Sequence, residues 1–316
     1  MENDEILKEL KLKTCSKNLR LPDGIIFSIF GNVLKVDLKD VSGNMQVDKY
    51  AFEGWIVCLK RWFPEIDKVE INWKHIKENN LHYNRFLFRV LQFKQMYSWF
   101  SFSEEKNQAI ADFKKGLEGT LLMNYPEKDK VHKIKGDEDK IEMLFANKYE
   151  ALLKERLQLN FLNQQLPVGV FEEFEEEKKK RRLFTGGKSA IDLWGIKNNE
   201  LCIFELKYHN KKPGKVGIIS ELLFYLSLMN EVFITEGITY PKIDDKDDKV
   251  WFRGFDKLYG KKFTSIKGYF LIDKLHPLID QKVVDMINLG LKEIGSISVH
   301  ILKYKYDTEL DKIELL

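Results

Sequence analysis

The sequence predicts an α/β protein: a mixed β-sheet flanked by helices, preceded by an α+β N-terminal domain. Three observations lead to this fold class. The chain has 316 residues, of which 44% are hydrophobic and 13% aromatic, enough for the cores of two domains. Its second half mixes short β-type segments with helical periods, which is typical of helices packed on a mixed sheet. A polar, charged stretch separates the halves.

The first half begins with a β-hairpin. Two apolar runs, Ile25–Phe30 and Val33–Leu38, flank the favourable two-residue turn Gly31-Asn32. The aromatic residues that follow recur with helical spacing, so we interpret them as core rather than as a surface on which bases stack. The expected helices lie at about Tyr50–Phe63, Tyr83–Trp99 and Ser103–Leu117. These elements form the expected domain 1–135, with a role in recognition or partner binding.

The second half is the expected domain 141–316, after a linker at Tyr125–Lys140. Its charge run, Glu172–Arg182, switches from acidic to basic, which suits a solvated helix or arm. The other expected elements are a helix at Ile141–Leu159, strands at Leu166–Phe171, Ala190–Ile196 and Leu201–Tyr208, a helix at Val216–Asn230, a strand at Ile266–Ile272, a helix at Pro277–Ile294 and a strand at Ser296–Tyr304.

Composition excludes several classes of protein. With 52 Lys and Arg against 49 Asp and Glu, the net charge of +3 does not indicate a strongly basic nucleic-acid module. The cysteines, Cys15, Cys58 and Cys202, form no CxxC pair and suit reduced thiols in a cytoplasmic protein. The acidic start is unlike a signal peptide, and no apolar run reaches the ~20 residues that span a membrane, so no membrane partner is expected.

Two familiar functional motifs are not present in complete form in the sequence. Gly186-Gly187-Lys188-Ser189 resembles the end of a phosphate-binding P-loop, but Arg182 stands where the first glycine is required. The histidines show no zinc-ligand spacing. A P-loop NTPase and a zinc-histidine site are therefore excluded.

The most informative segment is the hairpin that carries Asp192 and Glu205. Asn198-Asn199 suits a two-residue loop because asparagine tolerates positive φ. A loop there pairs Lys197 with Glu200, and the same register sets Asp192 directly opposite Glu205, with Cβ atoms ~5 Å apart. Lys207, two residues on from Glu205, projects to the same face.

Both strands of this hairpin are apolar on both faces, which is typical of a central, buried position in a sheet. Two opposed carboxylates in such a place repel each other and are costly to desolvate. A divalent cation between Asp192 and Glu205 would relieve both penalties, and carboxylate oxygens suit Mg²⁺ or Mn²⁺. The alternative is a salt-bridged hairpin end in which Lys207 neutralises Glu205.

Asp192, twelve intervening residues and then Glu205-Leu206-Lys207 resemble the PD-(D/E)xK nuclease superfamily, whose fold is restriction-endonuclease-like. The resemblance covers about Ile141 to Tyr304. It implies that Asp192 and Glu205 are metal ligands, that the Leu206 carbonyl completes the metal shell, and that Lys207 positions or activates water. Ile191 stands in place of the proline of the family name.

The resemblance also implies accessory residues. The family's opening helix often carries a glutamate, for which Glu142, Glu150 and Glu155 are candidates; we place Glu150 first, as a catalytic residue. Glu221 and Tyr225 resemble the Gln-x-x-x-Tyr motif of the exonuclease branch, although an ordinary helix surface pair explains them equally well. Lys211, Lys212 and Lys215 are candidates for holding phosphate, against the alternative of a solvated basic loop.

These features lead to the expectation of a Mg²⁺- or Mn²⁺-dependent deoxyribonuclease that hydrolyses phosphodiester bonds of DNA. The first alternative is a catalytically inactive protein of the same fold that binds nucleic acid or protein. The second is a purely structural interaction protein. The N-terminal domain would mediate contact with a second copy or with a protein partner.

Overall fold

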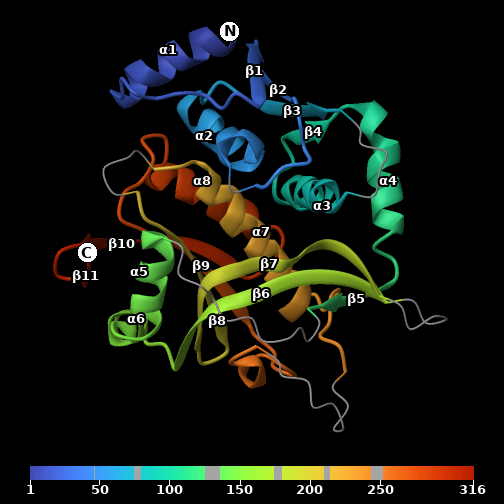
Figure 1. The fold of residues 1–316 in the computed structure, drawn as a ribbon. Coiled ribbons are helices and arrows are strands. Elements are labelled where there is room, and N and C mark those ends of the chain that lie inside the picture. The colour runs from blue at the N-terminus through green and yellow to red at the C-terminus, as the bar shows by residue number, and fades with distance from the viewer. Residues whose placement is uncertain (46, 75–79, 125–135, 174–179, 210–213, 243–251) are drawn as a thin grey trace. The chain divides into compact units, whose positions relative to one another are not determined.

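The computed structural model describes residues 1–45, 47–74, 80–124, 136–173, 180–209, 214–242 and 252–316 (Figure 1). The chain divides into two compact units, each assembled from separate stretches. Unit 1 comprises Met1–Glu118, Lys211–Phe224 and Leu275–Ile294, and unit 2 comprises Gly119–Asn210, Tyr225–Lys274 and Gly295–Leu316. The protein is a mixed α/β protein, as the sequence predicts. No helix in the described ranges has the length and apolar character needed to cross a bilayer.

Unit 1 is built on a four-stranded sheet in the order β1-β2-β3-β4. The first two strands form the predicted antiparallel hairpin, whose turn places Gly31 at a φ of 58°, and the other two add in parallel. The rings of Phe86, Phe93 and Phe100 surround Phe52, so these aromatic residues belong to the core. The strands are β1 (Ile25–Phe30), β2 (Val33–Leu38), β3 (Lys68–Trp73) and β4 (Phe100–Phe102). The helices are α1 (Asn3–Thr14), α2 (Phe52–Trp62), α3 (Leu81–Met96), α4 (Asn107–Lys115), α8 (Gln281–Leu291) and the first part of α7 (Gly217–Phe233).

The division of the chain differs from the expected domains 1–135 and 141–316. Helix α8 belongs to unit 1 although it lies late in the sequence. The Trp62 indole donates to the Leu278 carbonyl at 2.9 Å, and the Arg61 guanidinium pairs with Asp280, also at 2.9 Å. An amphipathic pattern reveals that α8 has an apolar face but not which surface that face covers, so sequence alone misplaces it.

Unit 2 is built on a seven-stranded mixed sheet in the order β11-β10-β9-β8-β7-β6-β5 (Figure 1). The central strands β8, β9 and β10 run parallel to one another, and every other neighbouring pair is antiparallel. The strands are β5 (Thr120–Met123), β6 (Phe161–Glu173), β7 (Lys180–Lys197), β8 (Glu200–Lys207), β9 (Ser265–Ile272), β10 (Ile297–Asp307) and β11 (Lys312–Leu315). β3, β4, β5 and β11 were not predicted. β4, β5 and β11 are too short to show a clear alternation, whereas the alternating polar and apolar residues of β3 were a signal that sequence reasoning missed.

The prediction of a helix or arm at Glu172–Arg182 is wrong for the residues of this run that the structure describes. β6 continues to Glu173 and β7 begins at Lys180, and the two residues pair across the strands. Glu172 likewise pairs with Arg181, and their side chains form an ion pair. The switch from acidic to basic residues therefore marks two antiparallel strand ends of opposite charge, which attract each other across the sheet.

The helix expected at Ile141–Leu159 is instead two helices, α5 (Asp137–Ala146) and α6 (Glu150–Leu157). The chain turns between them, where the Tyr149 N–H donates to the Leu144 carbonyl at 2.8 Å. Apolar residues on both helices enter one continuous cluster, so the sequence pattern looks unbroken across the turn.

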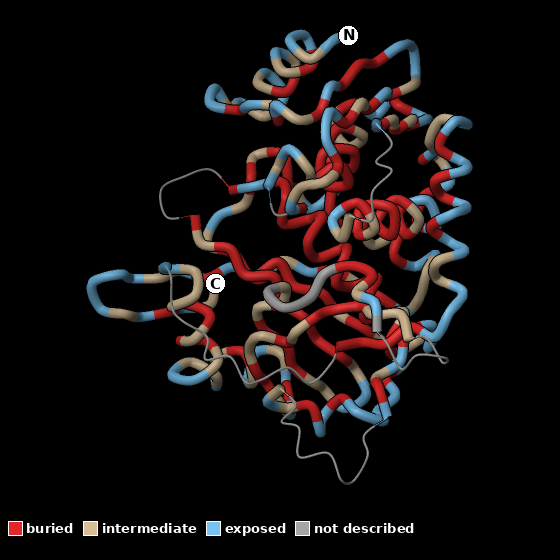
Figure 2. Tube along the Cα trace, turned by 45° about the vertical axis from the view of Figure 1, so that its right-hand side comes forward, coloured by how far each residue is buried: buried red, intermediate tan, exposed pale blue. Residues whose placement is uncertain are grey.

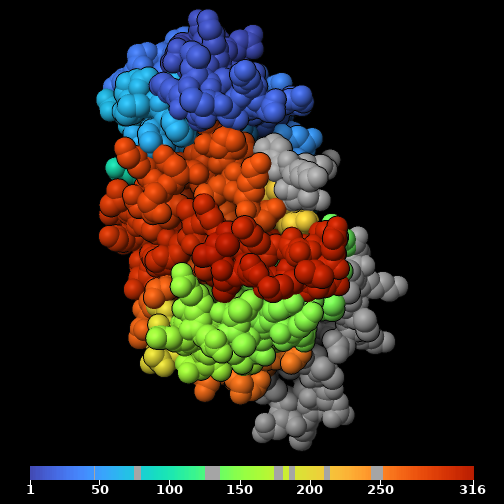
Figure 3. Space-filling model, turned by 90° about the vertical axis from the view of Figure 1, so that its left-hand side faces the viewer, coloured from blue at the N-terminus to red at the C-terminus, as the bar shows by residue number. Residues whose placement is uncertain are grey.

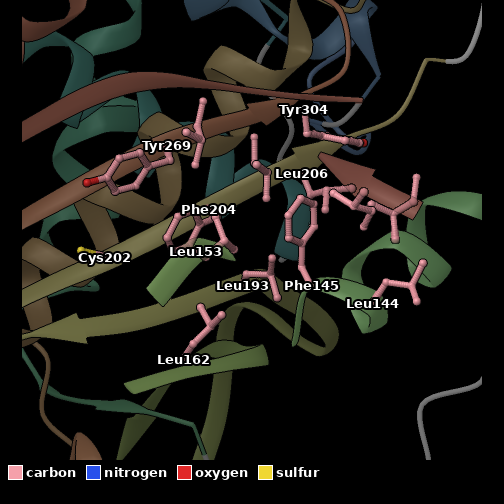
Figure 4. Close-up of a cluster of buried hydrophobic side chains, with 14 of the residues drawn as sticks. Leu144, Phe145, Leu153, Leu162, Leu193, Cys202, Phe204, Leu206, Tyr269 and Tyr304 are labelled. Atoms are coloured by element: carbon pink, nitrogen blue, oxygen red, sulfur yellow. The ribbon is translucent and has the colours of Figure 1, made fainter. Parts of the chain in front are cut away.

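One face of the unit 2 sheet is covered by α5 and α6. The ring centroids of Phe145 and Tyr304 lie 5.4 Å apart in an edge-to-face arrangement, among apolar side chains of β7, β8 and β9 (Figure 4). β8 is buried along nearly its whole length, in keeping with its central place. Figure 2 shows the burial of each described residue along the trace. Lys140 pairs with Asp311 at 2.6 Å where α5 lies against the C-terminal strands, green against dark red in Figure 3. The motif hairpin is therefore fixed inside a packed core.

Candidate functional site

The motif hairpin has the predicted register. Five pairs run from Lys197–Glu200 to Leu193–Phe204, and Asn198 adopts a φ of 54° in the turn. Since the carboxylates follow the last of these pairs, Asp192 and Glu205 are next in register. The predicted turn and the predicted alignment are confirmed along this ladder.

β7 and β8 separate at Asp192 and Glu205. β7 continues alongside β6, whereas β8 continues alongside β9, where Glu205 pairs with Phe270. The Asp192 Oδ2 atom accepts a hydrogen bond from the Leu206 backbone N–H at 2.8 Å. The side chain of Asp192 thus reaches across the opening between the two strands, toward the Glu-Leu-Lys segment.

Lys207 lies among oxygen atoms. Its Nζ atom donates to Glu205 Oε1 at 2.5 Å, to the Leu206 carbonyl at 3.1 Å and to Glu138 Oε1 at 3.2 Å. The side chain of Glu205 is 2% exposed and that of Lys207 is 11% exposed, so solvent screens their attraction weakly. The ammonium group is the positive charge that compensates the buried Glu205 carboxylate.

The helix glutamate beside this opening is Glu142, on α5. Its carboxyl is buried and accepts two hydrogen bonds of 2.8 Å from the Gln165 amide. Burial and, after it, the charge of Asp192 raise the pKa of Glu142 to about 8, against the opposing hydrogen bond from Gln165. Glu142 therefore extends the acidic group formed by Asp192 and Glu205.

Glu150, placed first from the sequence, does not join this group. It lies on α6 and pairs with Lys154 at 2.5 Å, one helical turn away. Glu155 is exposed. The expected single helix is two helices, and Glu150 begins the second of them, α6, whereas Glu142 lies on α5.

Sequence reasoning missed two residues. Gln165 lies on β6 opposite Asp192, between the pairs Gln164–Leu193 and Leu166–Ile191, and has a φ of 52°. Glu138 lies four residues before Glu142 on α5, so both point from one side of the helix. The i, i+4 spacing between Glu138 and Glu142 was the sequence signal that could have identified Glu138. No sequence signal indicated the positive φ of Gln165.

A second polar group fixes the end of β8. The His209 backbone N–H donates to both carboxylate oxygens of Asp273, at 3.0 and 3.1 Å, and His209 Nδ1 lies 3.0 Å from Asp273 Oδ1. The Tyr304 hydroxyl donates to the Lys207 carbonyl at 3.1 Å. These contacts hold the backbone around Lys207 in place.

The remaining predicted residues are Lys211, Lys212, Lys215, Glu221 and Tyr225. Lys211 and Lys212 lie outside the described residues, and Lys215 is exposed in unit 1. Glu221 and Tyr225 are both buried, so they are not an ordinary surface pair, but the boundary between the units falls between them. Their accessory role stays a prediction.

The donor types around the opening fit a hard divalent cation. Asp192, Glu205 and Glu142 offer carboxylates, and the Leu206 carbonyl adds a neutral oxygen. Lys207 contacts Glu205 and this carbonyl together, so its ammonium group stands in for a cation against two of these donors. Within the described residues, however, no three His, Cys, Asp or Glu side chains are already gathered in metal-binding geometry.

Comparisons of the chain with protein-family models, with curated proteins and with solved structures find no match. The geometry of unit 2 therefore carries the functional argument.

Proposed function

We propose that this protein is a divalent-metal-dependent nuclease that hydrolyses phosphodiester bonds of DNA, and that unit 2 is a restriction-endonuclease-like fold. The observation that carries the proposal is the separation of β7 and β8 at Asp192 and Glu205. It brings together two carboxylates, a backbone carbonyl and a lysine in the middle of a buried sheet. A core that needed only stability would favour apolar side chains here.

Asp192, Glu205 and the Leu206 carbonyl would hold Mg²⁺ or Mn²⁺, and Glu142 supplies a further carboxylate on the α5 side. The bound ion would polarise the phosphate and lower the pKa of a water molecule. Lys207 orients that water or stabilises the charge that develops on the phosphate oxygens. The Asp192 contact with the Leu206 N–H keeps the segment Glu205–Lys207 oriented toward the opening.

A second candidate function is a nuclease-like protein that binds nucleic acid or protein without cleaving it. The ion pair between Lys207 and Glu205 favours this alternative, because it compensates the buried carboxylate without any metal. The two candidates differ in one measurable property, since only the first requires a divalent cation for its activity.

The test is digestion of plasmid, linear and single-stranded DNA with Mg²⁺, Mn²⁺ or EDTA, with RNA as a parallel substrate. We expect cleavage of DNA with Mg²⁺ or Mn²⁺, none with EDTA, and none by Asp192→Asn. Glu150→Gln is the matched control, because it removes a carboxylate that pairs with Lys154 instead of facing Asp192. Equal cleavage by wild type and Asp192→Asn would refute the proposal, and cleavage of RNA alone would refute DNA as the substrate.

A further inference from the structure

Among the described residues, Glu205, Leu206 and Glu138 supply oxygen acceptors to the Lys207 ammonium group, and these acceptors fall into two classes. Glu205 Oε1 and the Leu206 carbonyl, at 2.5 and 3.1 Å, are atoms that the proposed function assigns to the cation. Glu138 Oε1, at 3.2 Å, comes from α5 and is not one of those ligands. The same ammonium group therefore bridges the proposed metal ligands and a carboxylate outside them.

A divalent cation and the ammonium group compete for the first class of acceptors. Both are positively charged, and both need oxygen lone pairs of Glu205 and Leu206. A cation held there repels the ammonium group and takes over those contacts. Of the three acceptors, Glu138 is the one whose contact with Lys207 the cation leaves intact.

Glu138 is well placed to hold the displaced group. It sits in the first turn of α5, a helix anchored by Ile141 and Phe145, which are fully buried. Its Oε2 atom lies 3.5 Å from the Tyr208 backbone nitrogen, directly after Lys207. Its side chain is 45% exposed, so its charge can stay hydrated while Lys207 moves.

We propose that Glu138 is a positioning residue that receives the Lys207 ammonium group when a divalent cation occupies Glu205 and the Leu206 carbonyl. This inference rests on the proposed metal site. Glu138 keeps the lysine beside the reacting phosphate and lowers the cost of displacing it from Glu205. Without Glu138, the ammonium group competes more strongly with the cation, and the cation binds more weakly.

The test is a calorimetric titration of Mn²⁺ into the full-length protein, without nucleic acid. Glu138→Gln removes the receiving charge and keeps the shape of the side chain. Asp137→Asn is the matched control, since it removes one charge from the same helical turn and is not one of the three Lys207 acceptors described above. Lys207→Gln, alone and combined with Glu138→Gln, removes the competing charge yet keeps a donor for Glu205. Thermal unfolding checks that each variant is folded.

We expect Glu138→Gln to weaken Mn²⁺ binding about three- to fivefold, the upper range for a partly exposed ion pair. Asp137→Asn should change it less than twofold. Lys207→Gln should tighten binding, and Glu138→Gln should then have less than a twofold effect. If Glu138→Gln weakens Mn²⁺ binding equally with and without Lys207, or does not weaken it at all, the inference is overturned while the metal site stands. Absence of Mn²⁺ binding by the wild type overturns the metal site, and the inference with it.

Discussion

Replacing Glu142 with glutamine should remove a pH-dependent penalty that the site imposes on the fold. Burial raises the pKa of Glu142 from its usual 4.5 to about 8, with Asp192 as the next cause and Asp139 and Glu138 adding to it. The Gln165 hydrogen bonds favour the ionised form and oppose this rise. Glutamine has the same shape, can still accept a bond from Gln165, and carries no charge.

The sign follows from the two states of the chain. Below pH 4.5 the Glu142 carboxyl is protonated in both the folded and the unfolded chain, so its burial carries no penalty for ionisation and the stability of the fold is not lowered. Between pH 4.5 and about 8 the unfolded chain ionises first, and the wild type loses about 1.4 kcal/mol of stability per pH unit. The total loss reaches at most about 5 kcal/mol and levels off above the folded pKa.

The assay is urea unfolding of wild type and Glu142→Gln from pH 5 to pH 9, with EDTA present to exclude metal. The stability of the variant relative to the wild type should rise steadily up to about pH 8 and then stay constant. A Glu142→Gln difference that is independent of pH would refute the reasoning, because it would mean that Glu142 ionises equally easily in both states.

Three further predictions follow from the same contacts. Asp192→Asn should lower metal-dependent cleavage by at least about 100-fold, as measured by cleavage rates. It should cost only about 1 kcal/mol of stability in urea unfolding, because the asparagine amide oxygen still accepts from the Leu206 N–H. Lys207→Ala should slow cleavage while Mn²⁺ still binds. It should also destabilise the metal-free fold by about 3 kcal/mol, because Glu205 loses its compensating charge. Unchanged stability of this variant would count against a buried ion pair. Glu150→Ala should leave cleavage unchanged and cost no more than ~0.5 kcal/mol, the range of an i, i+4 surface pair; a large loss of cleavage would restore Glu150 to the site.

The sequence predicted those features that depend on local pattern. The turn at Asn198-Asn199 and the register that follows from it were correct, because a two-residue loop leaves little freedom in pairing. The same holds for the first hairpin, where Gly31 adopts the positive φ that such a turn requires. The presence of the longer helices and of the strands around the motif was predictable for the same reason.

Features that depend on long-range contact could not be predicted. Glu142 and Glu150 lie on different helices, and the turn between α5 and α6 is hidden by a continuous apolar pattern. The pairing of Glu172 with Arg181 depends on two strands meeting, which a charge run alone does not reveal. Gln165 reaches the site through an unusual backbone angle, which its residue type does not indicate.

The interleaving of the two units constrains how the chain can be made and cut. Unit 1 is incomplete until residues 275–294 have been synthesised, and most of unit 2 is synthesised before them. A fragment that ends at residue 135 lacks α8 and leaves the indole N–H of Trp62 without the Leu278 carbonyl it meets in the intact chain. The two units should therefore fold in mutual dependence, and neither is a module that a single cut releases intact.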